Sequence, residues 1–271
     1  MRSSITRTAA LLCALCFAAG AQAADERLVL TGSSTVAPLA LEIGKRFERE
    51  NPGVRVDVQS GGSSRGVNDA RSGLADIGMA SRALEPAEAD LNADAIAMDG
   101  IGLIVHADNP VHTLDADQVR AIYTGALTNW KAVGGPDRRI TVVNKAEGRS
   151  TLALFLHQFG LTNRQIRAQV VIGDNEQGIK TVAGNPGAIG YVSIGTAEFD
   201  QAQGVPIRLL PMGGIAATVD NVASGRFPLA RPLNLVTTGT PGPLVRRFIA
   251  FARSERVRDL VREQFFVPLA R

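Results

Sequence analysis

The chain alternates short apolar runs with stretches in which apolar residues recur every three or four positions. Residues 28–30 form an apolar run that predicts a strand, and Leu39, Ile43 and Phe47 have the spacing of one helical face. Valines alternate with polar residues over positions 54–58, which predicts a second strand. The same patterns predict further strands at residues 76–82, 95–98, 101–105, 140–143, 188–192 and 233–236, and further helices beginning near residues 67, 85, 115, 152, 175, 244 and 255. Asp115 and Asn175 are expected to cap two of these helices.

This repeated order of strand, loop and helix favours an α/β protein whose parallel-rich sheet is covered by helices. The 271 residues exceed one domain of ordinary size, so two are expected. A long loop at residues 125–139 interrupts the pattern and carries Trp130. We interpret Trp130 as packing this loop through its large apolar ring, in preference to stacking on a ligand.

Three loops that each follow a predicted strand and open a predicted helix carry polar residues suited to an anion. They are residues 32–38, 60–66 and 145–151. A helix start exposes backbone N–H groups without partners and carries partial positive charge, so it can hold an oxyanion. A hydroxyl side chain there either caps the helix or donates to the anion. For one loop an ordinary cap is the commoner case, but three such loops in one chain favour an anion site.

The first residues of the chain have the pattern of a secretory signal peptide. Arg2 and Arg7 precede an apolar run at residues 9–19, and small residues follow at positions 21 and 23. We therefore predict residues 1–23 as a signal peptide that is cleaved after Ala23, which would place the protein in the periplasm. Cys13 and Cys16 lie in this segment, and neither follows the small residue that a lipid-attachment site requires.

Removal of that segment changes what the composition implies. Cleavage would leave 248 of the 271 residues and would remove two of the 29 basic residues, leaving 27 basic against 26 acidic side chains. The remaining charges are scattered along the chain, so nothing indicates a nucleic-acid partner. An exported chain without cysteine has no disulfide, and its stability must come from its core.

Six stretches, taken together, are more specific than any single glycine-rich loop. They are Gly32-Ser33-Ser34-Thr35-Val36, Ser60-Gly61-Gly62-Ser63, Gly73-Leu74-Ala75-Asp76-Ile77-Gly78, Ala80-Ser81-Arg82, Thr128-Asn129-Trp130 and Gly190-Tyr191-Val192-Ser193. In this order they resemble the phosphate-binding subunits of bacterial ABC transporters, the PstS-like group of type II periplasmic binding proteins. The resemblance spans most of the chain after residue 23.

The resemblance implies a two-lobe fold, with a mixed sheet flanked by helices in each lobe and the ligand in the cleft between them. Residues 24–105 with 232–271 would form lobe I, and residues 106–231 would form lobe II. Two hinge strands would cross near residues 105–106 and 231–235. The implied protein is a monomer without cofactor or metal. It would bind inorganic phosphate or a similar oxyanion and deliver it to the membrane permease of an ABC transporter.

Carried over by position, the resemblance assigns anion binding to nine residues. They are Ser34, Thr35, Ser63, Ser81, Arg82, Lys145, Arg149, Ser150 and Thr151. The third loop departs from the family pattern, because Lys145 replaces a leading arginine and Arg149 stands inside the loop; these cations are not equivalent. Arg149 either brings its guanidinium into the site or points to solvent. Some family members have an aspartate that accepts the proton of hydrogen phosphate where this chain has Ser81-Arg82, which implies weaker rejection of sulfate.

Two other classes of function compete with a transport receptor: an anion-site hydrolase of the phosphatase kind, and a scaffold or sensor that kept the fold. A hydrolase needs a base or a metal set. His106, His112 and His157 have no metal-ligand spacing, and a structural or surface role is expected for each. Asp76 is expected to hold a neighbouring segment by accepting backbone N–H bonds. The sequence therefore favours a binding protein with no catalytic residues.

Overall fold

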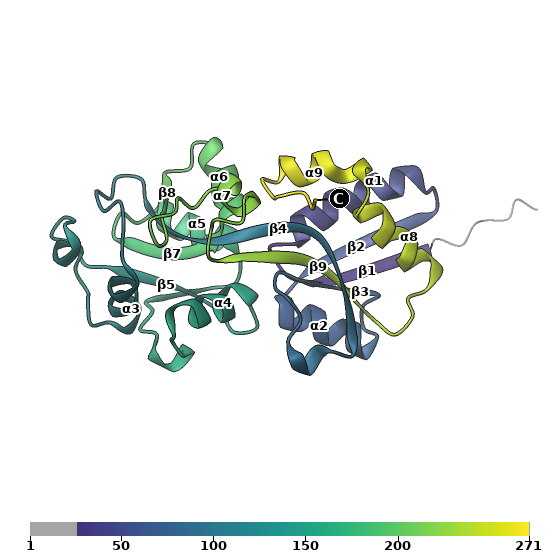
Figure 1. Cartoon of the computed structure of the whole chain (residues 1–271), viewed down its shortest axis with the longest axis horizontal. Coiled ribbons are helices and arrows are strands. Elements are labelled where there is room, and N and C mark those ends of the chain that lie inside the picture. Colours follow the sequence, from purple (N-terminus) through teal and green to yellow (C-terminus); the bar gives the residue numbers. More distant parts are fainter. Residues whose placement is uncertain (1–25, 271) are drawn as a thin grey trace, which may run out of the picture.

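Residues 26–270 are described by the computed structural model, and they form two α/β lobes joined by two strands (Figure 1). The predicted signal peptide, residues 1–23, lies outside the described residues. Lobe I contains β1 (Glu26–Gly32), α1 (Ala37–Glu50), β2 (Val54–Ser60), α2 (Ser63–Ser72), β3 (Ile77–Ala80), α8 (Pro243–Ala252) and α9 (Arg258–Glu263). Lobe II contains α3 (Ala116–Thr124), β5 (Thr141–Lys145), α4 (Ser150–Phe159), β6 (Val170–Ile172), α5 (Asn175–Ala183), β7 (Ala188–Ser193), α6 (Ile194–Ala202), β8 (Ile207–Leu210) and α7 (Val219–Ala223).

The strands that join the lobes are β4 (Leu91–His106) and β9 (Ala230–Thr238), which run antiparallel to each other. The strand order is β2-β1-β3-β9-β4-β7-β5-β6, and β8 also pairs with β4. Strand β1 is parallel to β2 and β3, whereas β9 is antiparallel to β3. Each lobe therefore has a mixed sheet, as the resemblance implies.

Strand β4 changes partners where the chain passes from one lobe to the other. Its residues up to Gly100 pair with β9, and Ile101 is the first to pair with β7. The crossing thus falls before the expected position at residues 105–106. The pattern predicted two strands here, but the structure has one, because Gly100 continues the extended chain. A Cβ atom at Gly100 would lie 2.6 Å from the side chain of Ile194, so glycine lets α6 pack against the crossing.

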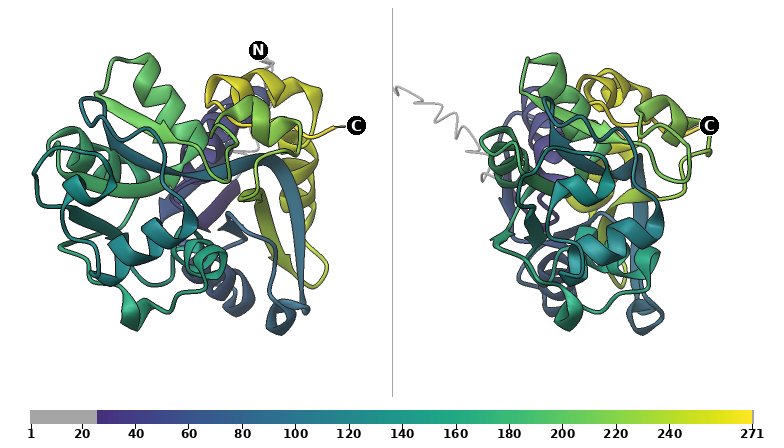
Figure 2. Two further views of the ribbon diagram at one scale, coloured as in Figure 1. Left: turned by 60° about the vertical axis from the view of Figure 1, so that its left-hand side comes forward. Right: turned by 90° about the vertical axis from the view of Figure 1, so that its left-hand side faces the viewer.

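The core of lobe I lies on both faces of its sheet. Helices α1, α8 and α9 cover one face and α2 covers the other (Figures 1 and 2). Leu39, Ile43 and Phe47 of α1 are buried, as their spacing predicts, and the Phe47 ring meets the Phe248 ring edge-on at 5.3 Å. These contacts fix the start of α1 at the end of β1, which positions the first polar loop.

The core of lobe II packs aromatic rings between β7 and helices α3 and α4. The Tyr191 ring stacks on Phe155 at 3.9 Å, and Tyr123 lies against both rings. Trp130 is fully buried in the same cluster, and its indole N–H donates to the carbonyl oxygen of Gly187 at 2.9 Å. The interpretation of Trp130 as packing the long loop is therefore confirmed.

Several predicted elements differ from the structure. The helix expected after Glu85 is a single 3₁₀ turn (Pro86–Glu88), and β6, α6, β8 and α7 have no counterpart among the predicted elements. Asp115 caps α3 as predicted, by accepting from the Gln118 backbone N–H. Helix α5 is capped by Asp174 and not by Asn175, whose side chain is turned to other partners.

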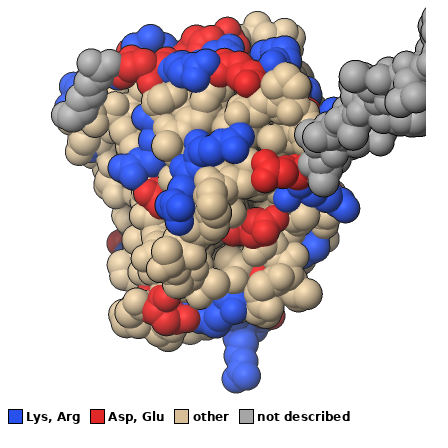
Figure 3. Space-filling model, turned by 90° about the vertical axis from the view of Figure 1, so that its right-hand side faces the viewer, with Lys and Arg blue, Asp and Glu red and all other residues tan. Residues whose placement is uncertain are grey.

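The surface at the lobe I end of the molecule carries interspersed charges of both signs (Figure 3). This agrees with the scattered charge pattern of the sequence. No helix within residues 26–270 is both long and apolar enough to cross a membrane.

Candidate anion-binding site

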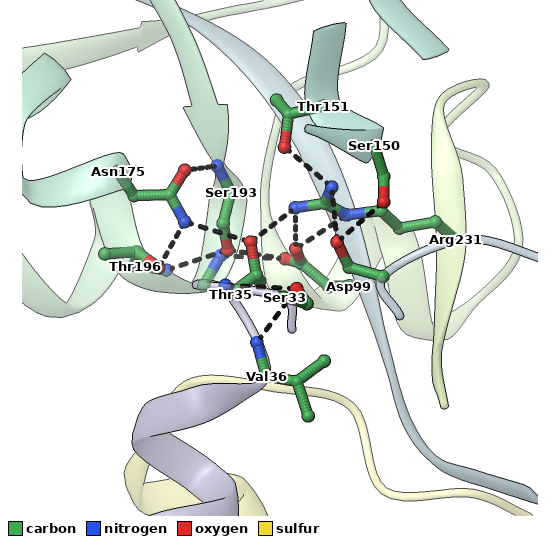
Figure 4. A network of polar contacts seen from close by, with 12 residues as sticks. Ser33, Thr35, Val36, Asp99, Ser150, Thr151, Asn175, Ser193, Thr196 and Arg231 are labelled. Carbon is green, nitrogen blue, oxygen red and sulfur yellow. Dashed lines mark hydrogen bonds and ion pairs between the residues drawn. The ribbon is translucent and has the colours of Figure 1, made fainter. Parts of the chain in front are cut away.

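Polar side chains from both lobes converge between the lobes, next to the crossing strands (Figure 4). Lobe I contributes the loop after β1, the start of α2 and the end of β3. Lobe II contributes the end of β5, the start of α4 and the start of α5. The three polar loops of the sequence therefore meet at one place, although 87 positions separate Ser63 from Ser150.

Arg231 of β9 stands at the centre of this cluster. Its side chain is 1% exposed, and it lies directly opposite Asp99 of β4 in the strand pairing. The guanidinium donates to Asp99 through Nε at 3.1 Å and Nη2 at 2.9 Å. It also donates to Thr151 at 2.9 Å and to Ser81 and Thr35 at 3.3 Å each. One arginine on a crossing strand thus contacts hydroxyls of both lobes.

The Asp99 carboxylate is fully engaged by donors. Besides Arg231, it accepts from the Ser193 hydroxyl at 2.9 Å and from the backbone N–H of Gly195 at 3.2 Å. A buried charge is costly unless it is paired and hydrogen-bonded, and this arrangement satisfies both groups. Asp99 therefore neutralises Arg231 and fixes the orientation of its guanidinium.

The hydroxyls of lobe I have two different roles. Ser33 accepts from the backbone N–H groups of Thr35 and Val36, so it closes the turn at the start of α1. Thr35 accepts from Arg231 and, at 3.2 Å, from the amide of Asn175. Since those two bonds occupy its lone pairs, the Thr35 proton is left for another acceptor.

Ser63 and Ser150 bring the second and third loops into contact. Ser63 accepts from the backbone N–H of Ser81 at 3.1 Å and from the hydroxyl of Ser150. Ser81 in turn donates to the Ser150 hydroxyl at 3.3 Å. Ser150 and Thr151 are the first two residues of α4, where backbone N–H groups lack helical partners. Both are about 4% exposed.

Lys145 lies at the end of β5 and is 3% exposed. Its ammonium donates to the side-chain oxygen of Asn175 at 3.0 Å. Its backbone N–H donates to the hydroxyl of Tyr191, which donates to Asn144. Burial, followed by repulsion from Arg231, lowers the pKa of Lys145 to about 7.

The other predicted residues lie at the edge of the cluster or away from it. Ser34 is half-buried and lines a groove of about 360 Å³ that Asn175 also lines. Arg149 packs across the lobes against Gly62, and its Nε is buried with no hydrogen-bond partner within residues 26–270. Arg82 donates to both oxygens of Glu88 at 2.6 and 2.7 Å. That pairing lowers the pKa of Glu88 and holds the Arg82 guanidinium on the Glu88 carboxylate.

Arg231, Asp99 and Asn175 hold central positions in the cluster and have no place in the sequence-based site. Asp99 lies between two predicted strands, residues 95–98 and 101–105. Arg231 lies just before the predicted strand at residues 233–236. A lone charge beside a buried strand needs a partner, and that signal could have found the pair. Asn175 was interpreted as a helix cap, which concealed its contacts with Lys145 and Thr35.

The remaining polar residues have structural contacts. Asp76 accepts from the backbone N–H of Val29 at 2.8 Å, which confirms the role predicted for it. His106 is buried near the end of β4 and accepts from the backbone N–H of Asp108. Across residues 26–270, no three His, Cys, Asp or Glu side chains are grouped so that they could hold a metal ion.

The fold defines a class of protein, a two-lobed binding protein of the type II periplasmic kind, and the cluster is a candidate anion site where the lobes meet. A profile of the PBP superfamily domain matches residues 18–256, and the chain belongs to this family. The resemblance and the fold inferred from the motifs are thereby confirmed.

Individual relatives agree with this assignment. The chain is 29% identical over 258 residues to the phosphate-binding protein PstS of Bacillus subtilis, covering 93% of this chain and 84% of the relative. It superposes with a TM-score of 0.83 and 31% identity on a proposed phosphate ABC transporter substrate-binding protein of Clostridium perfringens with bound phosphate, covering 90% of this chain and all of that one. An ABC-type phosphate transport receptor from Vibrio cholerae gives a TM-score of 0.71 at 30% identity, with coverage of 90% and 100%.

Proposed function

We propose that this chain is an exported solute-binding protein that captures phosphate, or a related tetrahedral oxyanion, and delivers it to the permease of an ABC transporter. One observation carries the proposal: the guanidinium of Arg231 contacts hydroxyls from both lobes at the place where three helix-opening loops meet. The similarity to phosphate-binding proteins is the reason for proposing phosphate as the anion. The predicted signal peptide supports a periplasmic location, and the receptor is proposed to act as a monomer.

The chemistry of the cluster suits a small anion with many acceptor oxygens. Thr35 and Ser63 each accept two hydrogen bonds within the protein, so their protons remain for the anion. The first turn of α4 adds backbone N–H groups and its partial positive charge. An anion held by both lobes would draw them together, as occurs in hinge closure around ligands.

The arrangement favours binding over hydrolysis. A hydrolase needs a base within reach of water or substrate. The carboxylate at the centre of the cluster, Asp99, already accepts four hydrogen bonds. His106 lies near the far end of β4 and accepts a bond there from the backbone of Asp108.

Calorimetric titration of the exported protein with phosphate tests the proposal. Thr151→Val and Ser63→Ala each remove one donor to a charged acceptor, which should cost about 1.5–3 kcal/mol, roughly a ten- to a hundredfold loss of affinity. Ser72→Ala is the matched control, because Ser72 is an exposed residue whose hydroxyl bonds only to its own helix. Wild-type binding by both cleft variants would contradict the assignment.

A further inference from the structure

The charges of the candidate site do not balance. Arg231 and Asp99 are both almost fully buried and form a pair at 2.9 Å, so together they contribute no net charge. Lys145 is a third buried charged residue of the cluster, and no carboxylate within residues 26–270 forms an ion pair with it. Among the fully buried charges of the cluster, the net positive charge therefore comes from Lys145; Arg149, which is half-buried, lies close enough to act on it.

Lys145 is connected to the hydroxyls of the opposite lobe. Its ammonium has three N–H donors, and one of them goes to Asn175. The amide of Asn175 continues to Thr35 of lobe I at 3.2 Å, and Thr35 accepts from Arg231. The lysine is thus part of the same network as the central arginine, and two of its donors remain for a ligand.

The groups that face Lys145 come from four segments. Burial disfavours its charged form most, and the charges of Arg231 on β9 and Arg149 before α4 disfavour it further. Asp174, before α5, favours the charged form. Tyr191 on β7 contacts the backbone of Lys145, and burial raises the pKa of its hydroxyl, so it stays neutral. Together these groups hold the pKa of Lys145 at about 7.

We propose that Lys145 supplies the net charge for anion binding, and that capture of a dianion draws one proton from solvent onto its amine. The inference rests on the proposed function of the cleft. The amine lone pair takes one proton from solvent and forms an N–H bond, and the resulting ammonium contacts the anion; no bond of the protein or the anion is broken. A guanidinium, which stays charged throughout the physiological range, could not couple capture to proton uptake.

Because anion capture is coupled to proton uptake by Lys145, phosphate affinity should fall as the pH rises. Bound anion stabilises the ammonium and raises its pKa, so binding is strongest where the free amine is already protonated. Above that pH, the amine must first gain a proton, and affinity falls by up to tenfold per pH unit. From a pKa of about 7, affinity expressed per concentration of the phosphate dianion should fall about fiftyfold between pH 7 and pH 9.

Titration calorimetry at pH 8.5, in two buffers of different ionisation enthalpy, counts the protons taken up with phosphate. Wild type should take up about one proton more than Lys145→Arg. Phosphate ionises identically in both titrations, so the difference in proton uptake between wild type and Lys145→Arg is due to Lys145. Lys131→Met is the control, because Lys131 is a surface lysine with 74% of its side chain exposed, and it should match wild type.

Lys145→Met provides a second variant in case arginine does not fit the buried position. It should bind phosphate at least tenfold more weakly than wild type at pH 6, and proton uptake at pH 8.5 should be lost. Equal proton uptake by wild type and both variants would overturn the inference, and so would wild-type affinity of Lys145→Met at pH 6. Absence of phosphate binding by wild type at pH 6 would instead contradict the proposed function itself.

Discussion

Asp99→Asn tests the buried ion pair that orients the central arginine. The substitution keeps the size of the side chain and removes its charge. In wild type, one carboxylate oxygen accepts from Ser193 and Gly195, and the other accepts twice from Arg231. If the asparagine oxygen keeps the bonds from Ser193 and Gly195, its NH₂ group must face the guanidinium of Arg231. Both of these groups are hydrogen-bond donors, so no bond forms between them.

The loss of folding stability expected for Asp99→Asn follows from the burial of both partners of the ion pair. The side chains of Asp99 and Arg231 are 0% and 1% exposed, so the variant leaves an uncompensated buried charge. Removal of one partner from a buried pair costs about 3–5 kcal/mol. The comparison is Asp94→Asn on the same strand, where the partner Arg253 is 51% exposed and the loss should stay below about 1 kcal/mol.

Urea unfolding of both variants, with and without phosphate, measures these differences. The free energy of unfolding should fall by the larger amount in Asp99→Asn alone. Phosphate at a hundred times the dissociation constant of each variant should add about 2.7 kcal/mol by mass action. Replacement of the lost negative charge beside Arg231 by the anion should appear as an Asp99→Asn dissociation constant no weaker than that of Asp94→Asn. Equal stability of the two variants, or weaker phosphate binding by Asp99→Asn than by Asp94→Asn, would refute this account of the pair.

Two other substitutions test neighbouring parts of the site. Arg82→Met should lower the free energy of unfolding by about 3 kcal/mol through the loss of the Glu88 pair, while phosphate affinity stays near wild type; a parallel loss of affinity would mean that Arg82 binds the anion. Gly62→Ala should hinder closure of the lobes, because the added methyl would lie 2.7 Å from the carbonyl oxygen of Gly148. Small-angle scattering should then show less compaction with phosphate than wild type does, and equal compaction would contradict the prediction.

The apolar periodicity of the sequence was sufficient to predict the strand–loop–helix units. Leu39, Ile43 and Phe47 of α1, for example, are buried as the pattern predicts. So are Leu28 and Leu30 of β1. Such patterns are local, because they follow from the period of one helix or strand. They failed where the local sequence was ambiguous, as at Gly100, which resembles a break between strands and in fact continues β4.

The candidate site was predictable only in part for the same reason. Ser63, Ser150 and Thr151 belong to loops with a recognisable pattern, and the structure brings them together. Arg231 and Asp99 are 132 positions apart, and only the antiparallel pairing of β4 with β9 places them face to face. Arg82 occupied a position that the motif associates with the ligand, but Glu88, six positions later, forms an ion pair with it.

Native mass spectrometry of the exported protein, purified without added phosphate, tests the central claim most directly. Wild type should carry one bound anion with the mass of phosphate per chain, and Arg231→Met, which removes the donor shared by both lobes, should carry none. Circular dichroism of the variant establishes that it is folded. A wild-type protein that carries a different ligand, or an Arg231→Met variant that retains phosphate, would contradict the assignment of this cleft as a phosphate site centred on Arg231.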